Sequence, residues 1–600
     1  MAVSEKPSGG SRLLTRFAFL AAVLFAVNVW HPWLWGPDET REAEIARETL
    51  AHGHWIVASF NNVPFVEKPP LYYDLAAVAL GLGGGHPGAA RAVSALLGLV
   101  MLGAVLRLGS RRSGALFAVL AGTMMLLLPQ FYRKAHWILL DIGVGASLGV
   151  AFAVYGGWLL DPGRKESNLS LALFWSAAAA AFLTKGTVTL VYLGMVLLPC
   201  MIRRRRLLPC RLNWTVAFFA VPIAVWILLL WREGGVWYLH EHFVNNIVGR
   251  LIHRNLHLPG SPIFVNDVGG SSPWYFYLKR SPHLLGPLFI VMPFALTAAW
   301  RRMRCAATPR PPCSAPPECG GWRGVPKRLF RFAERITRPA AAPSPEERDY
   351  LFFLIVWAAV PFVLFSIPAI KEVSYLLPSF GAAALLVAEF LAPFIDRREA
   401  ERFFRCGFAV PLLLCAAIVQ GIAPWSVTAA TLCFGLVAAG SAAFCVAALR
   451  RRRFTSALLL ASAVGIASIV FGNAPAVLRH TGNERKNYCD LASVVWREVG
   501  NRELCMDAGD ESIRGALAFC GRRELVMLPG YEALLAEMAA SRGAGEKGRA
   551  FLFVDKRFES FRRRDRAFAE LLAGFREFRP DFPKKADRFV LLIPLAAARR

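Results

Sequence analysis

Long apolar stretches recur along the whole chain, and they restrict its fold more strongly than any other feature of the sequence. A helix needs about 20 apolar residues to cross the hydrocarbon core of a bilayer, and about thirteen such segments can be counted here. Their centres lie near residues 23, 98, 121, 150, 176, 193, 222, 291, 358, 383, 413, 437 and 463. Because 55% of the residues are hydrophobic and only 18% are charged, we expect a polytopic α-helical membrane protein.

Basic residues gather in alternate loops, so the net charge of +27 indicates membrane topology and not nucleic-acid binding. With the N-terminus in the cytoplasm, the predicted inner loops hold the arginines near residues 107–112, 164, 203–211, 301–338, 397–405 and 450–453. The first predicted outer loop, 34–87, has more carboxylates than bases. An odd number of spans therefore places the tail outside. The first apolar run reaches Trp33 and Trp35 without a small-residue cleavage site, so we expect an uncleaved first span.

Two domains are predicted: a transmembrane domain at 1–473 and a periplasmic α/β domain at 474–600. In the tail, apolar segments near 504–506, 525–528, 551–554 and 589–592 alternate with helical patterns near 512–519, 531–538 and 562–572. Two loops of the membrane domain stand out, a long periplasmic loop at 233–283 and a proline-rich cytoplasmic loop at 301–348. The second is expected to carry a short basic amphipathic helix at 327–337.

The cysteines give no metal-site pattern. Cys305, Cys313 and Cys319 have spacings unsuited to zinc. The tail holds three cysteines, Cys489, Cys505 and Cys520, and this odd count leaves the pairing of one disulfide open.

The first outer loop, 34–87, carries two charged motifs, and loops of this length in compact proteins are usually functional. The first motif is Asp38-Glu39-Thr40-Arg41-Glu42-Ala43-Glu44, in which Asp38 can cap a helix starting near Thr40. The second is Glu67-Lys68-Pro69-Pro70-Leu71-Tyr72-Tyr73, in which two prolines stiffen the chain after a charged pair. The plainer interpretations are a capped interfacial helix and a weak surface salt bridge.

These two motifs together resemble the aminoarabinose lipid A transferase group, which is related to the protein O-mannosyltransferases within the C-type glycosyltransferase superfamily. The resemblance continues in order through Asp141, Lys185-Gly186, the stretch 240–250, the stretch 273–277, and Lys371 with Ser374-Tyr375-Leu376-Leu377-Pro378. It therefore covers most of residues 12–390. One departure is Glu42, where the family usually has an aromatic residue, and this bears on the identity of the sugar or acceptor.

The resemblance implies an inverting transfer of a sugar from undecaprenyl phosphate to lipid A or another envelope glycan or lipid, without a covalent enzyme intermediate. It is expected to occur on the periplasmic face of the bacterial inner membrane. Asp38 is the expected general base, and Asp141 is expected to position the acceptor or the Asp38 loop. Expected to stabilise the donor phosphate are Lys68, Lys185, Arg250, Lys371 and Tyr375. Expected to position substrate or loop are Glu39, Arg41 and Glu67.

Purely structural roles remain as alternatives for several of these residues. Lys185 can snorkel from a helix end, Tyr375 can belong to an interfacial aromatic belt, and Asp141 can cap a helix. Glu67 and His242 are weak candidates for a divalent metal, with His253 and His257 equally available, and two ligands are too few for a site. We expect no required cofactor.

Two other functions stay open. One is a protein O-glycosyltransferase on the same scaffold. The other is a secondary transporter, which the sequence disfavours because the ionisable residues cluster in outer loops and the two halves of the chain show no similarity.

Overall fold

The structure is a computed structural model of the whole chain. It describes residues 8–35, 38–161, 166–206, 209–249, 252, 254, 256, 258, 271–304, 343–406, 408–421, 427–451, 453–474, 477, 488–506, 511–528, 530–580 and 589–595. Every structural statement below concerns these residues. Arg250, His253, His257, Cys305, Cys313, Cys319 and the helix expected at 327–337 lie outside them.

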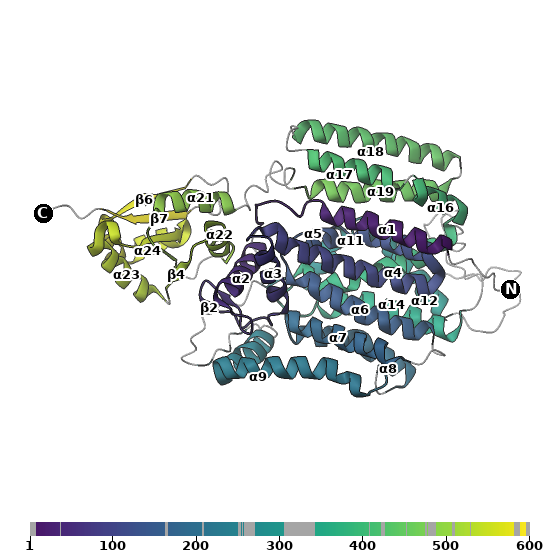
Figure 1. Cartoon of the computed structure of the whole chain (residues 1–600), viewed down its shortest axis with the longest axis horizontal. Coiled ribbons are helices and arrows are strands. Elements are labelled where there is room, and N and C mark those ends of the chain that lie inside the picture. Colours follow the sequence, from purple (N-terminus) through teal and green to yellow (C-terminus); the bar gives the residue numbers. More distant parts are fainter. Residues whose placement is uncertain are drawn as a thin grey trace, which may run out of the picture.

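A bundle of long, roughly aligned helices forms the larger part of the molecule (Figure 1). Its helices are α1 (Ser8–Ala26), α4 (Pro87–Leu126), α5 (Pro129–Ala135), α6 (Leu140–Leu160), α7 (Asn168–Lys185), α8 (Val188–Arg204), α9 (Ala217–Leu239), α11 (Phe276–Leu285), α12 (Leu288–Arg304), α14 (Pro345–Leu364), α15 (Phe380–Leu391), α16 (Arg397–Cys406), α17 (Ala409–Gly421), α18 (Val427–Arg450) and α19 (Phe454–Gly472). Short helical segments connect them: η1 (Trp214–Val216), η2 (His240–Gly249), η3 (Val373–Ser379) and η4 (Ala392–Phe394).

By length and composition, six helices could cross a membrane, and the bent pair α11–α12 would make a seventh span. Helix α4 is broken at Ser113 and Gly114, whose backbone angles are not helical. The fold predicted from the sequence, a polytopic helical membrane protein, is confirmed at this level.

The first outer loop folds into helices at one end of the bundle (Figure 1). It contains α2 (Asp38–His52), the short strands β1 (Ser59–Phe60) and β2 (Val63–Pro64), and α3 (Leu71–Leu82). Helix α2 begins at Asp38, so this residue lies in its first turn and does not cap a helix that starts near Thr40. Apolar side chains of α2 and α3 pack with Ile138 and Leu140 of the bundle and with Phe519 of the tail in one buried cluster.

The tail forms a mixed α/β domain, as the sequence predicts. Its sheet has the order β4-β3-β5-β7-β6, with parallel pairs around β3 and antiparallel pairs around β7. The strands are β3 (Leu504–Met506), β4 (Leu525–Met527), β5 (Ala550–Val554), β6 (Phe575–Phe578) and β7 (Phe589–Pro594); the helices are α21 (Tyr488–Val499), α22 (Glu511–Gly521), α23 (Tyr531–Ala544), α24 (Asp555–Arg564) and α25 (Arg566–Leu571), with η6 (Gly545–Lys547) and η7 (Leu572–Gly574). Helix α21 and strand β6 are additions to the elements predicted from the sequence.

Successive side chains along each strand point to opposite faces of the sheet, and both faces are buried. Leu504, Met506 and Leu552 face a core shared with α21 and α22, whereas Phe551 and Phe553 face a core shared with α23, α24 and α25. This period of two is the pattern of a sheet covered on both sides. The disulfide Cys489–Cys520 joins α21 to α22, and Cys505 is free and buried in the strand β3.

Candidate active site

Three charged or polar side chains from distant parts of the chain meet at the end of the bundle that carries α2. Asp141 lies in the first turn of α6, and Lys185 is the last residue of α7. The Lys185 ammonium donates a hydrogen bond to the Asp141 carboxylate and lies 4.8 Å from the centre of the Tyr375 ring. An acidic residue at a helix N-terminus and a lysine at a helix C-terminus both complement the helix dipoles, which favours this placement.

These three residues line a small cavity together with apolar side chains. Val144, Val188 and Phe365 form part of its wall. A pocket that combines one ammonium with apolar walls has the chemistry needed for a phosphate attached to a hydrocarbon chain.

Asp38 extends the cluster from the side of the first loop. Its carboxylate is about a third exposed and is near enough to act electrostatically on Lys185 of α7 and on Glu372. A partly exposed carboxylate beside the cavity is accessible to an acceptor hydroxyl, as a general base must be.

Arg41 holds Asp38 from within the same helix. Its guanidinium lies 3.4 Å from the Asp38 carboxylate, 2.8 Å from Glu42 and 2.5 Å from Glu511 of α22. Burial raises the pKa of the Glu42 carboxyl, while the adjacent Arg41 lowers it. Glu42, the departure from the family pattern, thus serves as a buried partner of Arg41 in this protein.

Glu39 is fully buried and organises the backbone around the site. It accepts hydrogen bonds from Arg91 Nε at 2.7 Å, from the Trp35 amide at 2.8 Å and from the Ile138 amide at 3.2 Å. Arg91 also donates to the carbonyl groups of His31 and Trp33. This buried ion pair ties α2 to α4 and to the segment before Asp141, so Glu39 has the contacts of a positioning residue.

The second motif of the first loop lies against the end of α7. Lys68 pairs with Glu67 at 3.5 Å, and the Glu67 carbonyl accepts a hydrogen bond from Asn246 in η2. Gly186 has a φ of +74°, and a Cβ there would lie 3.0 Å from His242 Nε2 and 3.7 Å from Pro69. Glycine at this position therefore lets the second motif and η2 approach the end of α7 closely.

Lys371 is nearly buried, and its ammonium donates to the carbonyl groups of Ser272 and Pro368. These contacts hold the segment before η3 in place. Arg250, the remaining cation predicted to bind the donor phosphate, lies outside the described residues.

Three charged residues near the site were not identified from the sequence. Arg91 is a single charge inside an apolar stretch, and such an intramembrane charge is itself a signal of a functional or structural partner. Lys134 acts electrostatically on both Asp141 and Glu372, and Asp141 acts on Glu372. Neither Lys134 nor Glu372 belongs to a distinctive motif, and only the folding of η3 against α5 and α6 brings them together.

Few side chains near the site could coordinate a metal ion. His242 Nδ1 bonds to the Val66 carbonyl at 2.9 Å, and its buried Nε2 has no hydrogen-bond partner among the described residues. Within the described ranges, no group of three His, Cys, Asp or Glu side chains could hold a metal ion. Glu67 and His242 alone do not fit a complete protein-based site, so no step below depends on a metal.

No family model matches the chain, but curated proteins do. It is 26% identical over 481 residues to an undecaprenyl phosphate-alpha-4-amino-4-deoxy-L-arabinose arabinosyl transferase of Pectobacterium carotovorum subsp. carotovorum (strain PC1), covering 76% of this chain and 75% of that protein. The transferase of the same name from Edwardsiella ictaluri (strain 93-146) is 27% identical over 436 residues, covering 68% of this chain and 66% of that protein. The resemblance to the aminoarabinose transferase family is confirmed.

Among solved structures, the chain matches the crystal structure of ArnT from Cupriavidus metallidurans bound to undecaprenyl phosphate. The TM-score is 0.63, the sequence identity is 18%, and 99% of both chains is covered. The same protein in its apo state gives a TM-score of 0.63 over 98% of both chains. At this identity the likeness establishes the fold alone, and it extends over both the helical bundle and the α/β domain of this chain.

Proposed function

We propose that this protein is an inverting glycosyltransferase that moves a sugar from undecaprenyl phosphate to an acceptor. A polyprenyl-phosphate-sugar transferase of the aminoarabinose transferase type is the function that the distant relatives support. We further propose that the acceptor is lipid A or another envelope glycan or lipid.

The observation that carries the proposal is the meeting of Asp141, Lys185 and Tyr375 at one cavity, with Asp38 acting on Lys185 from the neighbouring loop. These residues come from four segments, and the first and last of them are separated by more than half the chain. Ionisable residues at the membrane end of a bundle are costly to bury, and their convergence in one place favours a functional role.

The cluster supplies the two groups that sugar transfer needs, a general base for the acceptor and a cation for the leaving phosphate. The acceptor hydroxyl oxygen attacks C1 of the sugar, and its proton passes to the Asp38 carboxylate. The bond between C1 and the phosphate oxygen breaks, and the electron pair leaves with undecaprenyl phosphate. The Lys185 ammonium stabilises the negative charge that develops on this phosphate, with Tyr375 beside it. Asp141 holds Lys185 in position.

Lys68 is proposed as a second cation at the phosphate, with Arg250 as a third. The contacts of Lys371 with two carbonyl groups favour a role in holding the Tyr375 segment. Glu39, Arg41 and Glu67 are proposed to position the first loop.

We also propose about thirteen membrane spans, with the cluster and the α/β domain on the periplasmic side of the bacterial inner membrane. Each predicted span centre falls within a helix of the bundle. Helix α4 contains two of these centres, one on either side of its break. The alternation of basic loops supports the same orientation. A disulfide in the tail suits an oxidising compartment.

The proposal is tested by donor turnover in detergent with a synthetic polyprenyl-phosphate-linked aminosugar and purified lipid A. Release of undecaprenyl phosphate and a mass increase of the acceptor are the expected products. Asp38→Asn is expected to lower the rate at least about 100-fold, because general-base catalysis contributes this much or more.

Asp349→Asn is the matched control. Asp349 forms an ion pair with Arg203 of α8, with 3.0 Å between the two groups, and this pair lies away from the cluster. The control variant should retain turnover. Full activity of a folded Asp38→Asn protein would remove Asp38 from the base role, and no donor consumption with any envelope acceptor would contradict sugar transfer itself.

A further inference from the structure

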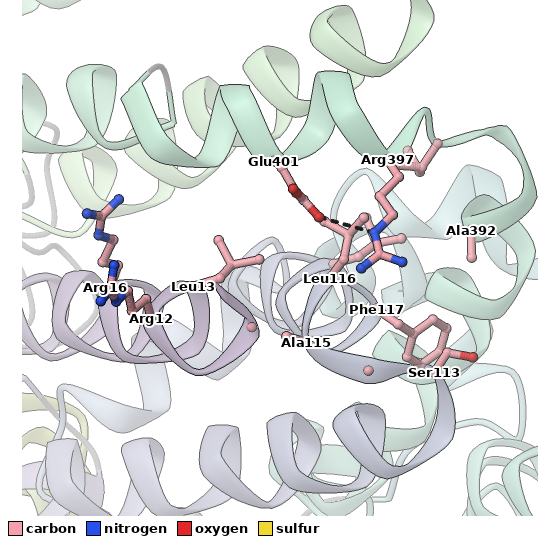
Figure 2. A pocket seen from close by; sticks show the side chains of 14 residues that line it. Arg12, Leu13, Arg16, Ser113, Ala115, Leu116, Phe117, Ala392, Arg397 and Glu401 are labelled. Carbon is pink, nitrogen blue, oxygen red and sulfur yellow. Dashed lines mark hydrogen bonds and ion pairs between the residues drawn. The ribbon is translucent and has the colours of Figure 1, made fainter. Parts of the chain in front are cut away.

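A second cavity, of about 750 Å³, lies at the end of the bundle opposite α2. It is an open hollow bordered by α1, the second half of α4, and the segment from η4 to α16 (Figure 2). The break at Ser113 and Gly114 turns α4 back on itself here, and Gly10 of α1 packs against Ala115. The turn of α4 and the start of α16 thus leave a hollow beside α1.

Arginines dominate the polar lining of this cavity. Arg12 and Arg16 are four residues apart on α1, so they share one face of the helix, and both are exposed. Arg397 pairs with Glu401 at 3.1 Å, and this pair faces the cavity from α16 (Figure 2). Three guanidinium groups therefore surround the hollow with one carboxylate among them, which favours an anionic occupant.

Apolar side chains form the rest of the wall. Leu13 and Leu116 lie between the arginines of α1 and Arg397, and Phe117 lies beside Ser113 (Figure 2). Phe19, about two turns further along α1, is 70% exposed on the outside of the bundle. A small inorganic anion gains no favourable contact with this apolar wall. A molecule with a charged head group and hydrocarbon chains can contact both the arginines and the apolar side chains.

The position along the bundle fits a lipid head group. The cavity lies at the end of the bundle where basic segments such as 203–206, 301–304 and 397–402 gather, and basic residues at the ends of membrane spans attract anionic lipid head groups. Guanidinium groups bind phosphate oxygens through paired hydrogen bonds and are preferred over lysine for this contact.

We propose that this cavity binds the phosphodiester head group of an anionic phospholipid from the leaflet on that side of the membrane. The head group lies in the cavity, where Arg12 and Arg16 line one side and Arg397 the other, and the acyl chains run along α1 past Phe19. The site is separate from the Asp38 cluster and does not depend on the proposed sugar transfer.

The test is native mass spectrometry of the full-length protein titrated with palmitoyl-oleoyl phosphatidylglycerol. We expect the triple variant Arg12→Gln/Arg16→Gln/Arg397→Gln to weaken binding of the first lipid at least about tenfold. The matched control is Arg450→Gln/Arg451→Gln, because both arginines are exposed at the C-terminal end of α18 and neither lines the cavity. It should bind within about twofold of the parent protein.

A variant that keeps every charge provides a second measure should the triple variant fold poorly. Leu116→Trp narrows the cavity, and it is expected to weaken phosphatidylglycerol binding. Unchanged binding by a folded triple or Leu116→Trp protein would overturn the proposal, as would an equal loss in the control.

Two further titrations identify the ligand class. Glycerol 3-phosphate is expected not to displace the lipid; displacement at equal concentration would assign the cavity to a free phosphate. Palmitoyl-oleoyl phosphatidylcholine is expected to bind more weakly and to lose less affinity in the triple variant, because its quaternary ammonium offsets the charge of its phosphate. An equal loss with this lipid would contradict recognition of a net anionic head group.

Discussion

The guanidinium of Arg41 in α2 bonds to the carboxylate of Glu511 in α22 at 2.5 Å, and the same guanidinium lies 3.4 Å from Asp38. The helices touch here, since a Cβ on Gly515 of α22 would lie 2.5 Å from the Thr40 carbonyl oxygen. The α/β domain is therefore joined directly to the helix turn that carries the proposed general base.

Substitution Glu511→Gln is expected to lower sugar transfer about fivefold without preventing folding. The ion pair is partly exposed, so its loss should cost about 1 kcal/mol, and this energy restrains the orientation of Arg41 beside Asp38. The measurement is kcat and KM for donor turnover alongside the thermal unfolding midpoint. Glu503→Gln is the control, because Glu503 pairs with Arg549 within the α/β domain at 2.7 Å. Equal effects of the two substitutions would mean that domain stability, and not the contact with α2, sets the rate.

Substitution Arg91→Met is expected to destabilise the protein by about 3 to 5 kcal/mol, because it leaves Glu39 buried without its charged partner. Unfolding in a detergent series would measure the change. The double variant Arg91→Met/Glu39→Gln should regain part of the lost stability, since no uncompensated charge remains. A double variant as unstable as the single one would show that the carbonyl contacts of Arg91, and not its ion pair, are decisive.

Removal of the disulfide Cys489–Cys520 is expected to lower the stability of the α/β domain by about 3 to 4 kcal/mol, because the bond closes a loop with a sequence separation of 31. Hydrogen exchange of α21 and α22 would report this locally. A reducing agent should bring the parent protein to the exchange rates of Cys489→Ser/Cys520→Ser and leave the variant unchanged. Identical protection in the oxidised protein and the variant would contradict a stabilising role.

A pH dependence is expected from Glu372. Burial, and then the nearby Asp38 carboxylate, raise the pKa of Glu372 above its usual 4.5. The folded protein thus holds this proton more strongly than the unfolded chain, so the stability contribution of Glu372 falls as pH rises from 4.5 through the raised value. Glu372→Gln should therefore gain stability relative to the parent as pH increases, measured by the difference in unfolding midpoints between pH 4.5 and 8. A difference that stays constant over this range would assign the titration to another group.

Much of the architecture could be predicted because its signals are local. Apolar segments of membrane length identified the helices, and alternating apolar segments identified four strands of the tail. β6 was missed because Arg576 and Glu577 interrupt its apolar pattern, and its pairing with β7 is what makes it a strand.

The candidate site could be predicted only in part. Asp38, Lys68, Asp141, Lys185 and Tyr375 were found through a family resemblance that orders motifs along the chain. The sequence could not indicate that Lys371 is held by carbonyl groups of Ser272 and Pro368, because the partners lie in segments remote from each other. Arg91 offered a signal as a lone charge in an apolar stretch, but its partner Glu39 is visible only in the fold.

The sequence by itself determined that this chain is a multi-pass helical membrane protein with an α/β tail, because hydrophobic length and periodicity are properties of contiguous residues. Only the tertiary structure decided which charges meet. An ion pair such as Lys185 with Asp141, or Arg41 with Glu511, depends on how helices distant in sequence pack against one another, and that packing is set by the shape of many side chains at once.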